Sequence, residues 1–489
     1  MRSYTFASSA LLSISGVAGS VLMNNGLAAT PQMGWDNWNA YGCDVSADLL
    51  LDSAQAMADL GLRDVGYHYV ILDDCWSDGR YENGSLRPNF EKFPNGMAAI
   101  ADYIHSLGMG YGMYSSAGKY TCAQYAGSLG HETTDANTFA SWGVDYLKYD
   151  NCYNEGQSGN PNISYARYEK MSTALNNTGR PILYSMCNWG QDRPWDWAFT
   201  IANSWRATGD ITDFFDRPDV RCPCEDKEGL NCEFPGFHCS VMNIINKMVW
   251  TIQRSQPGGW NDLDALEVGN GGMSDEEYKL HMTMWASMKS PLLIGTNVQT
   301  LDAKSYSILT NPAILALSQD PAGAAIIRRW SYQVPQKDIF GVGEVQMFSG
   351  SLSNGDYAVV LLNAATDEMH MNATAGDIFV DEGGKISAAA KSAWDVYDLW
   401  ANRMPDSVAN QILQSNGTAG FSAAQNYYYN ATAQSYADGI AANDTLLMGT
   451  KVGTLEALGT LKAMVPAHGV MAYRLRPSNA TAVSKRDEL

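Results

Sequence analysis

Residues 144–152 read Val-Asp-Tyr-Leu-Lys-Tyr-Asp-Asn-Cys, a short apolar run that ends in charged and polar residues. Similar runs recur between residues 30 and 300, separated by longer stretches with helical spacing. With 144–147 they make eight: 33–35, 67–72, 109–114, 181–184, 201–205, 258–260 and 291–294 complete the set. Eight strands that alternate with helices predict an α/β fold, a (β/α)8 TIM barrel.

The helical stretches agree with this prediction. Leu50, Ala54 and Met57 share one face at helical spacing, and residues 274–277 (SDEE) form a capping box that starts another helix. An open, doubly wound sheet is the alternative. It would normally show a Gly-rich phosphate turn after its first strand, and the sequence has none there.

Six of the apolar runs end in polar tips. These tips are Asp73-Asp74, Ser115-Ser116, Lys148 to Asp150, Asn188-Trp189, Arg206 to Asp210, and Asn261 to Asp264. In a barrel they would converge at the carboxyl ends of the strands, where active sites lie. One polar tip could be an ordinary loop start, but six that are rich in Asp and Trp predict a sugar pocket. Carboxylates accept hydrogen bonds from sugar hydroxyls, and aromatic rings pack on C–H faces.

The pattern changes after residue 320. Short β-strands are predicted at 345–348, 357–362, 394–397 and 470–473, with turns at Asn354-Gly355 and Gly383-Gly384. They indicate a C-terminal antiparallel β-sandwich domain. We expect a signal peptide at 1–19, the catalytic barrel at 24–318, the β domain at 325–477 and a tail at 478–489.

Composition limits the partners. The 489-residue chain has a formal charge of -20, which disfavours nucleic acid. Its seven His are scattered and predict no metal site. No stretch after the N-terminal segment is apolar enough to span a membrane. That segment has Arg2, an apolar run through Leu12 and Val17, and then small residues, so it reads as a secretory signal rather than as a buried first helix.

Two further features fit a secreted glycoprotein. Eight N-x-S/T sequons start at Asn83, Asn162, Asn176, Asn372, Asn416, Asn430, Asn443 and Asn479. The nine Cys should mostly pair in an oxidising compartment, with at least one left over. Zinc binding by Cys222, Cys224, Cys232 and Cys239 is the alternative for that cluster. The terminal residues 486–489 (RDEL) resemble an ER-retrieval signal, so retention in the ER competes with secretion.

Hydrolysis of a glycosidic bond needs two carboxyl groups. Asp150 is the candidate nucleophile, because Lys148 lies two residues away on the same side of an extended strand and would keep it ionised. A surface Lys–Asp ion pair is the alternative. Asp210, with Arg206 four residues earlier, is a candidate acid/base. Asp213 and Asp216 are equally possible from spacing alone.

Asp73 and Asp74 are adjacent carboxylates. At a strand end both can turn into the mouth and bind two hydroxyls, as the 4-OH and 6-OH of galactose would require. A metal site is the rival interpretation, but it would need more oxygen ligands in a local pattern such as an EF-hand.

With these residues in place, the chain resembles the α-galactosidases of glycoside hydrolase family 27, most closely the secreted fungal melibiases. The resemblance covers nearly everything after the signal segment. Its motifs are PQMGWDNWN (31–39), LDDCW (72–76), FPNGM (93–97), MYSSAG (113–118), DYLKYDNC (145–152), CNWG (187–190), GGWNDLD (258–264), KSPL (289–292), DVYDLWANR (395–403) and PAHG (466–469).

The resemblance implies a retaining exo-glycosidase that releases terminal α-D-galactose from sugars such as melibiose and raffinose, with no cofactor and no metal. It places the nucleophile at Asp150 and the acid/base at Asp210. The substrate-binding residues it implies are Trp38, Asp73, Asp74, Tyr114, Cys122, Lys148, Trp189, Arg206, Gln253 and Asp264. It also implies the disulfides Cys43–Cys75, Cys122–Cys152, Cys222–Cys239 and Cys224–Cys232, with Cys187 unpaired.

One position departs from many family members, which have Glu where Asn188 stands; this concerns recognition of the sugar 2-hydroxyl. An α-N-acetylgalactosaminidase and a non-catalytic galactose-binding protein are the alternatives. Trp189 and the Cys122–Cys152 bridge favour a tight pocket and therefore galactose. Both carboxylates are present, which favours an enzyme over a binding protein. The enzyme is also expected to form a homo-oligomer.

Overall fold

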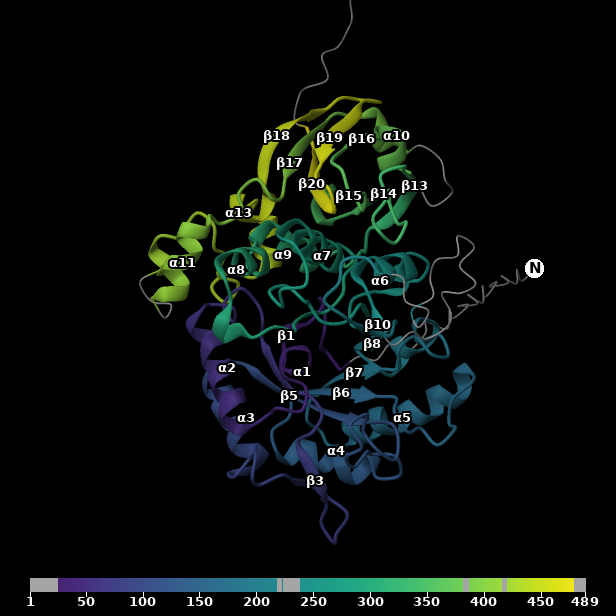
Figure 1. Ribbon diagram of the computed structural model, residues 1–489, viewed down its shortest axis with the longest axis vertical. Helices are drawn as coiled ribbons and strands as arrows, with labels where there is room; N and C mark the ends of the chain where they lie inside the picture. The colour runs from purple at the N-terminus through teal and green to yellow at the C-terminus, as the bar shows by residue number, and fades with distance from the viewer. Residues whose placement is uncertain (1–24, 218–221, 223–237, 381–386, 416–419, 479–489) are drawn as a thin grey trace, which may run out of the picture.

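The structure, a computed structural model, describes residues 25–217, 222, 238–380, 387–415 and 420–478. The described chain forms a parallel barrel followed by a domain of antiparallel strands, and Figure 1 shows the second domain stacked on one end of the first. The predicted signal peptide, the Cys224–Cys232 pair, the Gly383-Gly384 turn and the terminal RDEL motif lie outside the described residues.

Eight parallel strands build the barrel, which confirms the predicted fold. They are β1 (Met33–Asp36), β2 (Tyr69–Leu72), β5 (Gly110–Ser116), β6 (Tyr146–Asp150), β7 (Leu183–Cys187), β8 (Ser204–Arg206), β11 (Trp260–Asp262) and β12 (Leu292–Ile294). Their order in the sheet is β11-β8-β7-β6-β5-β2-β1-β12. A parallel bridge between Leu266, which follows β11, and Ile294 of β12 closes the ring. Each predicted apolar run overlaps one of these strands.

Helices lie outside the barrel. They are α1 (Trp38–Tyr41), α2 (Ala47–Asp59), α3 (Gly96–Ser106), α4 (Glu132–Ser141), α5 (Pro161–Asn177), α6 (Val241–Met248), α7 (Asp275–Ser287), α8 (Ala303–Leu309) and α9 (Pro312–Ser318). The predicted capping box starts α7, where the Ser274 side chain accepts from the Glu277 backbone and the Glu277 side chain accepts from the Ser274 backbone. Between β7 and β8 two 3-10 turns, η1 (Pro194–Asp196) and η2 (Ala198–Thr200), replace the expected helix.

Two short pairs of strands lie in the connections that follow barrel strands. After β2, the strands β3 (Ser77–Arg80) and β4 (Leu86–Pro88) form an antiparallel hairpin that projects away from the C-terminal domain (Figure 1). After β8, the strands β9 (Asp210–Ile211) and β10 (His238–Cys239) pair in parallel.

Buried tryptophans fix the wall between the barrel and its helices. The indole N–H of Trp285 on α7 donates to the backbone oxygen of Asp264 at 2.8 Å, and that of Trp205 on β8 donates to Asn261 at 2.7 Å. Because a buried indole N–H needs a partner, these bonds set the ring positions and hold the loop after β11 in place.

The C-terminal domain is a β-sandwich, as predicted. Its larger sheet has the order β13-β14-β15-β20-β17-β18. These strands are β13 (Ile327–Gln333), β14 (Glu344–Ser351), β15 (Tyr357–Asn363), β17 (Trp394–Asp398), β18 (Thr450–Leu455) and β20 (Gly469–Pro477), and the smaller sheet pairs β16 (Met369–Thr374) with β19 (Thr460–Val465). Met347, Leu361 and Leu475 are among the residues in the core of this domain.

Four short helices belong to this domain: α10 (Ala375–Ile378), α11 (Asp406–Gln414), α12 (Tyr436–Ala441) and α13 (Thr445–Met448). The segment from α11 to α13 packs on the barrel, where Tyr428 and Tyr436 donate through their hydroxyls to the backbone oxygens of Gly61 and Val65 at 2.8 and 2.9 Å. The sequence did not predict this layer.

Three of the four expected disulfides are present: Cys43–Cys75, Cys122–Cys152 and Cys222–Cys239. The alternative zinc interpretation also used Cys222 and Cys239, but these two residues are bonded to each other and so are not thiolate ligands. Cys187 is free and buried, as expected. Across the described part of the chain, no helix has the length and apolar character that a membrane span requires.

Candidate active site

Strand β6 places Lys148 and Asp150 on the same side, since they are two residues apart on an extended strand. Asp150 is the last residue of the strand and is buried. One carboxylate oxygen, Oδ1, accepts from the backbone N–H of Asn151 at 2.8 Å, and the other, Oδ2, accepts from the Tyr114 hydroxyl at 2.9 Å. These bonds fix the plane of the carboxylate at the barrel mouth.

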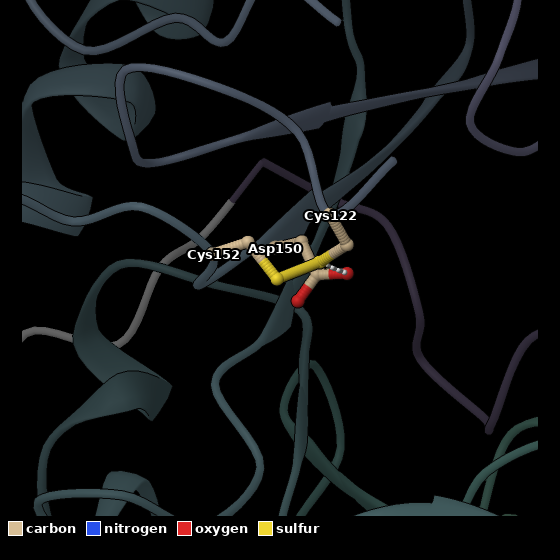
Figure 2. A group of neighbouring side chains, drawn as sticks. All are labelled: Cys122, Asp150 and Cys152. Atoms are coloured by element: carbon tan, nitrogen blue, oxygen red, sulfur yellow. Dashed lines mark hydrogen bonds between the residues drawn. A yellow bond between two sulfur atoms is a disulfide. The ribbon is translucent and has the colours of Figure 1, made fainter. Parts of the chain in front are cut away.

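A disulfide lies against this carboxylate. Figure 2 shows the Cys122–Cys152 bridge beside Asp150, with Sγ of Cys122 at 3.3 Å from Oδ2. A disulfide sulfur carries no proton, so this is a close contact rather than a donated hydrogen bond. Cys122, Asp150 and Cys152 are residue types that can hold a metal, but the two sulfurs are bonded to each other and so are not available as thiolate ligands.

Opposing effects act on the ionisation of Asp150. Burial raises its pKa from 3.8 to about 7, and the nearby Asp210 carboxylate adds to the rise. Lys148 and the bonds from Asn151 and Tyr114 act in the other direction and favour the carboxylate. The ionised form needed for nucleophilic attack therefore depends on these neighbours.

Lys148 connects two carboxylates in the barrel interior. Its ammonium lies 2.6 Å from Oδ2 of Asp73 and 3.9 Å from Oδ2 of Asp36. Burial by itself lowers the pKa of Lys148, but Asp73 and Asp36 together raise it well above its ordinary value, so the ammonium stays charged. Burial and the Asp73 carboxylate raise the pKa of Asp36 to about 8, while Lys148 opposes the rise.

Asp74 is held by backbone donors. Its Oδ1 accepts from Cys75 N–H at 2.7 Å and its Oδ2 accepts from Ala123 N–H at 2.9 Å. Burial raises its pKa, while the bond from Ala123 opposes the rise. With Asp73 paired to Lys148 and Asp74 bonded to two N–H groups, both carboxylates are oriented by the protein itself, which suits a pair of sugar hydroxyls better than a metal ion.

Arg206, at the end of β8, organises the other side of the site. Its guanidinium lies 2.7 Å from Oδ2 of Asp264 and 3.0 Å from Oδ1 of Asp210. Burial lowers the pKa of Arg206, but Asp264 and other neighbouring groups raise it well above its ordinary value. Asp264 has φ of 81°, an uncommon left-handed conformation for a residue other than glycine.

Asp210 differs from the other carboxylates in its exposure. Its side chain is 52% exposed, against 4% for Arg206, to which it is paired. A carboxyl group in contact with both Arg206 and solvent can exchange protons with water, as an acid/base must.

The two competing carboxylates are engaged differently. Asp213 accepts from the Tyr278 hydroxyl at 3.0 Å and is also bonded to the backbone N–H of Gly272. Asp213 lines the cavity described below, whereas Asp216 is not among the residues that line it.

These side chains line one open cavity of about 790 Å³ at the barrel mouth. Ten of the twelve predicted site residues line it: Trp38, Asp73, Asp74, Tyr114, Cys122, Lys148, Asp150, Arg206, Asp210 and Asp264. A smaller cavity of about 20 Å³ lies among Asp36, Lys148, Asp262 and their neighbours. Four of the six predicted strand tips therefore meet at this cavity, while the tips Ser115-Ser116 and Asn188-Trp189 do not line it.

The structure does not bring Trp189 and Gln253 to the cavity. Trp189 follows β7 with φ of 58° and is half-buried, but its side chain is not part of the lining. Gln253 is exposed on the 3-10 turn η4 (Ile252–Arg254), which precedes β11, and the site is built from residues that follow the strands. The placement of these two residues in the pocket is therefore not supported by the geometry of this chain.

Asn188, the position that departs from many family members, is buried at the end of β7. Its side-chain nitrogen donates to the backbone oxygen of Gln191 at 2.7 Å, while its Oδ1 has no partner among the described residues. Asn188 does not line the cavity either.

Sequence reasoning missed several lining residues. They are Asn39, Ala40, Gly42, Cys187, Ile211, Thr212, Asp213 in this role, Glu267, Gly269, Asn270, Thr296, Asn297 and Thr300. Thr296 and Asn297 follow β12, so the rule that polar strand tips converge would have found them. Glu267 lies five residues beyond β11 and is buried with bonds to Asn39 and Asn270, a position that no local pattern indicates.

Comparison with known proteins agrees with this geometry. Residues 30–220 and 236–320 match the family model described as Alpha galactosidase A, and residues 342–423 match the Alpha galactosidase C-terminal beta sandwich domain. The α-galactosidase of Torulaspora delbrueckii is 56% identical over 97% of this chain and 99% of its own length.

Solved structures give the same result. An α-galactosidase from Saccharomyces cerevisiae is 55% identical, covers 93% of this chain and 99% of its own, and superposes with a TM-score of 0.88. A second structure of α-galactosidase from this yeast, determined with raffinose, is 54% identical with the same coverage and TM-score. On the strength of the barrel, its carboxylate-lined cavity and these matches over nearly the whole chain, the protein belongs to the α-galactosidases of glycoside hydrolase family 27.

Proposed function

We propose that Asp150 is the nucleophile and Asp210 the acid/base with which this α-galactosidase releases terminal α-linked galactose. The enzyme class follows from its family membership. The assignment of residues rests on one observation: Asp150 and Asp210 line the same cavity, one buried beside a lysine and the other half exposed beside an arginine.

The reaction proceeds in two displacements. The Asp150 carboxylate attacks the anomeric carbon, the bond from that carbon to the leaving oxygen breaks, and Asp210 gives its proton to that oxygen. The product is a β-linked galactosyl ester on Asp150. Water then attacks the same carbon, Asp210 takes the proton of the water, and the ester bond breaks. Galactose leaves in the α configuration, so the overall outcome is retention.

The remaining side chains support binding of the sugar. Asp73, Asp74 and Lys148 offer acceptors and a donor for vicinal hydroxyls, and Arg206 can donate to a hydroxyl near Asp210. Trp38 and Tyr114 supply aromatic surface in the same cavity. The Cys122–Cys152 bridge fills the space beside Asp150, next to the reacting carbon. This supports unsubstituted galactose as the substrate, because an acetamido group on the adjacent carbon needs additional room.

The test compares Asp150→Asn, Asp210→Asn and Asp213→Asn with the wild type on an aryl α-galactoside and on melibiose. We expect the first two variants to lose activity by on the order of 10³-fold or more, with their fold intact. Asp213→Asn is the matched control and should keep most of its activity. Wild-type turnover by Asp150→Asn would rule out Asp150 as the nucleophile. Faster hydrolysis of an aryl α-N-acetylgalactosaminide than of the aryl α-galactoside would show that galactose is not the preferred sugar.

We also propose that the chain enters the secretory pathway through its N-terminal segment and acts outside the cell. The apolar run after Arg2 and the eight sequons support this route. The terminal RDEL motif supports retention in the ER as the competing destination. Fractionation of cells that express the chain with and without residues 486–489 decides between them: release only after truncation would establish retention.

We further propose that the enzyme associates with copies of itself. Large apolar side chains lie exposed on the C-terminal domain and near α6, with Ile339 93%, Tyr332 62% and Trp250 59% exposed. Aromatic and other large apolar side chains are enriched at association sites. Light scattering on the purified protein tests this, and a mass of one chain would contradict it.

A further inference from the structure

The hairpin between β3 and β4 closes through a defined turn. The backbone N–H of Gly84 donates to the oxygen of Tyr81 at 2.9 Å, and the N–H of Tyr81 donates to the oxygen of Ser85 at 2.9 Å. Gly84 has φ of 85°, which a glycine adopts at no steric cost. Together these features define a four-residue turn followed by a glycine bulge, one of the common hairpin connections.

This turn contains a sequon, Asn83-Gly84-Ser85. Asn83 is exposed, and its Oδ1 accepts from the Ser85 backbone N–H at 3.1 Å and from the Ser85 hydroxyl at 2.7 Å. Both of these bonds are made to Oδ1 of the Asn83 amide, not to its nitrogen Nδ2. The nitrogen Nδ2 is the atom to which an N-linked sugar is attached, so a sugar on Asn83 displaces no packed side chain.

An aromatic ring lies two residues before the sequon in the same turn. The side chain of Tyr81 is 43% exposed, and Tyr81 also lines a groove of about 620 Å³ beside the hairpin. The groove includes the rings of Phe90 and Trp142 and the amide of Asn137, and none of its lining residues is charged. Exposed rings with neutral amides and hydroxyls are the surface that a sugar prefers, because its C–H face packs on the ring and its polar groups need donors and acceptors.

We propose that Asn83 carries an N-linked oligosaccharide whose first N-acetylglucosamine packs on the ring of Tyr81, with the following sugars lying along the groove. The inference rests on the proposed secretory route, where a lipid-linked diphospho-oligosaccharide is the donor. The bond from Asn83 Nδ2 to the anomeric carbon forms, the bond from that carbon to the diphosphate oxygen breaks, and the amide proton leaves to the transferase.

The packed sugar stabilises the hairpin. A two-stranded hairpin that projects from a domain has little core of its own. The sugar covers an exposed ring at the turn and so adds apolar contact where the hairpin lacks it. The sequon at Asn430 also has a tyrosine two residues earlier, but Tyr428 is half-buried and its hydroxyl donates to the backbone oxygen of Gly61. Asn176, near the end of α5, has Ala174 at that spacing and serves as a control.

The experiment uses the full chain secreted from a eukaryotic host. Glycopeptide mass spectrometry measures the occupancy of each sequon, and hydrogen exchange measures the protection of residues 77–88. Five chains are compared: wild type, Tyr81→Thr, Asn83→Gln, the double variant Tyr81→Thr/Asn83→Gln and the control Asn176→Gln. A sixth sample is wild type trimmed by an endoglycosidase to a single N-acetylglucosamine.

We expect Asn83 to be occupied. Hairpin amides should exchange about 3- to 10-fold faster in Asn83→Gln than in the wild type, as loss of one ring contact predicts. The trimmed enzyme and Asn176→Gln should match the wild type. In the Tyr81→Thr background, adding Asn83→Gln should have a smaller effect than it has in the wild type, because only the two bonds from Ser85 to Asn83 are then lost.

If Asn83 carries no sugar in a chain that is glycosylated at other sequons, the proposal of a sugar on Asn83 is wrong, but the proposed secretory route is not contradicted. Equal exchange in the wild type and Asn83→Gln, or full protection by the sugar without Tyr81, would overturn the packing. If the protein from the eukaryotic host carries no sugar at any sequon, both the proposed secretory route and this inference are wrong.

Discussion

Sγ of Cys122 lies 3.3 Å from Oδ2 of Asp150, and the bridge from Cys122 to Cys152 holds it there. Cys152 is two residues after Asp150, and Cys122 comes from the loop after β5. The disulfide thus ties the loop after one barrel strand to the nucleophile at the end of the next.

Removal of this bridge by the double substitution Cys122→Ala and Cys152→Ala should lower kcat/KM by about 10- to 100-fold, because a small displacement of a reacting group has an effect of this size. The free energy of unfolding should fall by about 2–4 kcal/mol. Steady-state kinetics and urea unfolding measure the two effects. Wild-type kcat/KM in a folded variant would show that the bridge does not position Asp150.

Lys148 is expected to be essential for sugar binding. Lys148→Met leaves the buried Asp73 without its cation and removes a charged donor to the sugar, so kcat/KM should fall by about 10- to 100-fold, as loss of a charged hydrogen bond predicts. The control is Lys451→Met, whose side chain is half exposed and pairs with Asp395 on the far domain. Equal activity of the two variants on an aryl α-galactoside would contradict the role of Lys148.

Glu267 should make stability depend on pH. Burial raises its pKa from 4.5 to about 8 in the folded protein, and the bonds from Asn270 and Asn39 only partly oppose the rise. Between these values the folded state holds a proton that the unfolded state releases. Stability due to this group is therefore present below pH 4.5 and is lost as pH rises towards 8, by at most about 1.4 kcal/mol per pH unit.

The variant Glu267→Gln mimics the protonated form and does not ionise. Urea unfolding at several pH values should show a flatter fall in the free energy of unfolding for the variant than for the wild type between pH 4.5 and 8. Parallel profiles would mean that Glu267 titrates as it does in the unfolded chain.

A buried ion pair in the C-terminal domain provides a test of stability that is distant from the active site. Arg474 and Asp356 lie 3.0 Å apart, and both side chains are 0% exposed. Asp356→Ala leaves the Arg474 charge buried and should lower the free energy of unfolding by about 3–5 kcal/mol. Asp78→Ala, at an exposed pair with Arg87, should change it by less than about 1 kcal/mol. Similar losses for both variants would be inconsistent with this account.

The barrel could be predicted from the sequence because its strands are short, apolar and regularly followed by polar tips. That regularity also predicted seven of the lining residues, since the carboxyl ends of parallel strands must meet, whereas Trp38, Tyr114 and Cys122 were predicted from the resemblance. The layer from α11 to α13 could not be predicted, because Tyr428 and Tyr436 pack through hydroxyl bonds to distant backbone oxygens, which leave no periodic pattern in the sequence.

Gln253 and Trp189 are the two predicted site residues that do not line the cavity. Gln253 was predicted from the resemblance alone, whereas Trp189 also stands at one of the six polar strand tips. Gln253 precedes its strand, and Trp189 follows its strand in a left-handed conformation without joining the cavity lining. The choice of Asp210 over Asp213 also came from resemblance; the Tyr278 hydroxyl bonded to Asp213 is a tertiary contact that spacing does not reveal.

Helix α7 is shared by the two domains. On one side Trp285 bonds to the backbone of Asp264, and on the other Trp400, Arg403 and His468 of the C-terminal domain bond to Thr283, Asp275 and Glu277. A chimaera that exchanges the β-sandwich for that of a relative would therefore need compatible residues at 400, 403 and 468. A change at the domain border would therefore also affect α7, and through Trp285 the position of Asp264 in the catalytic cavity.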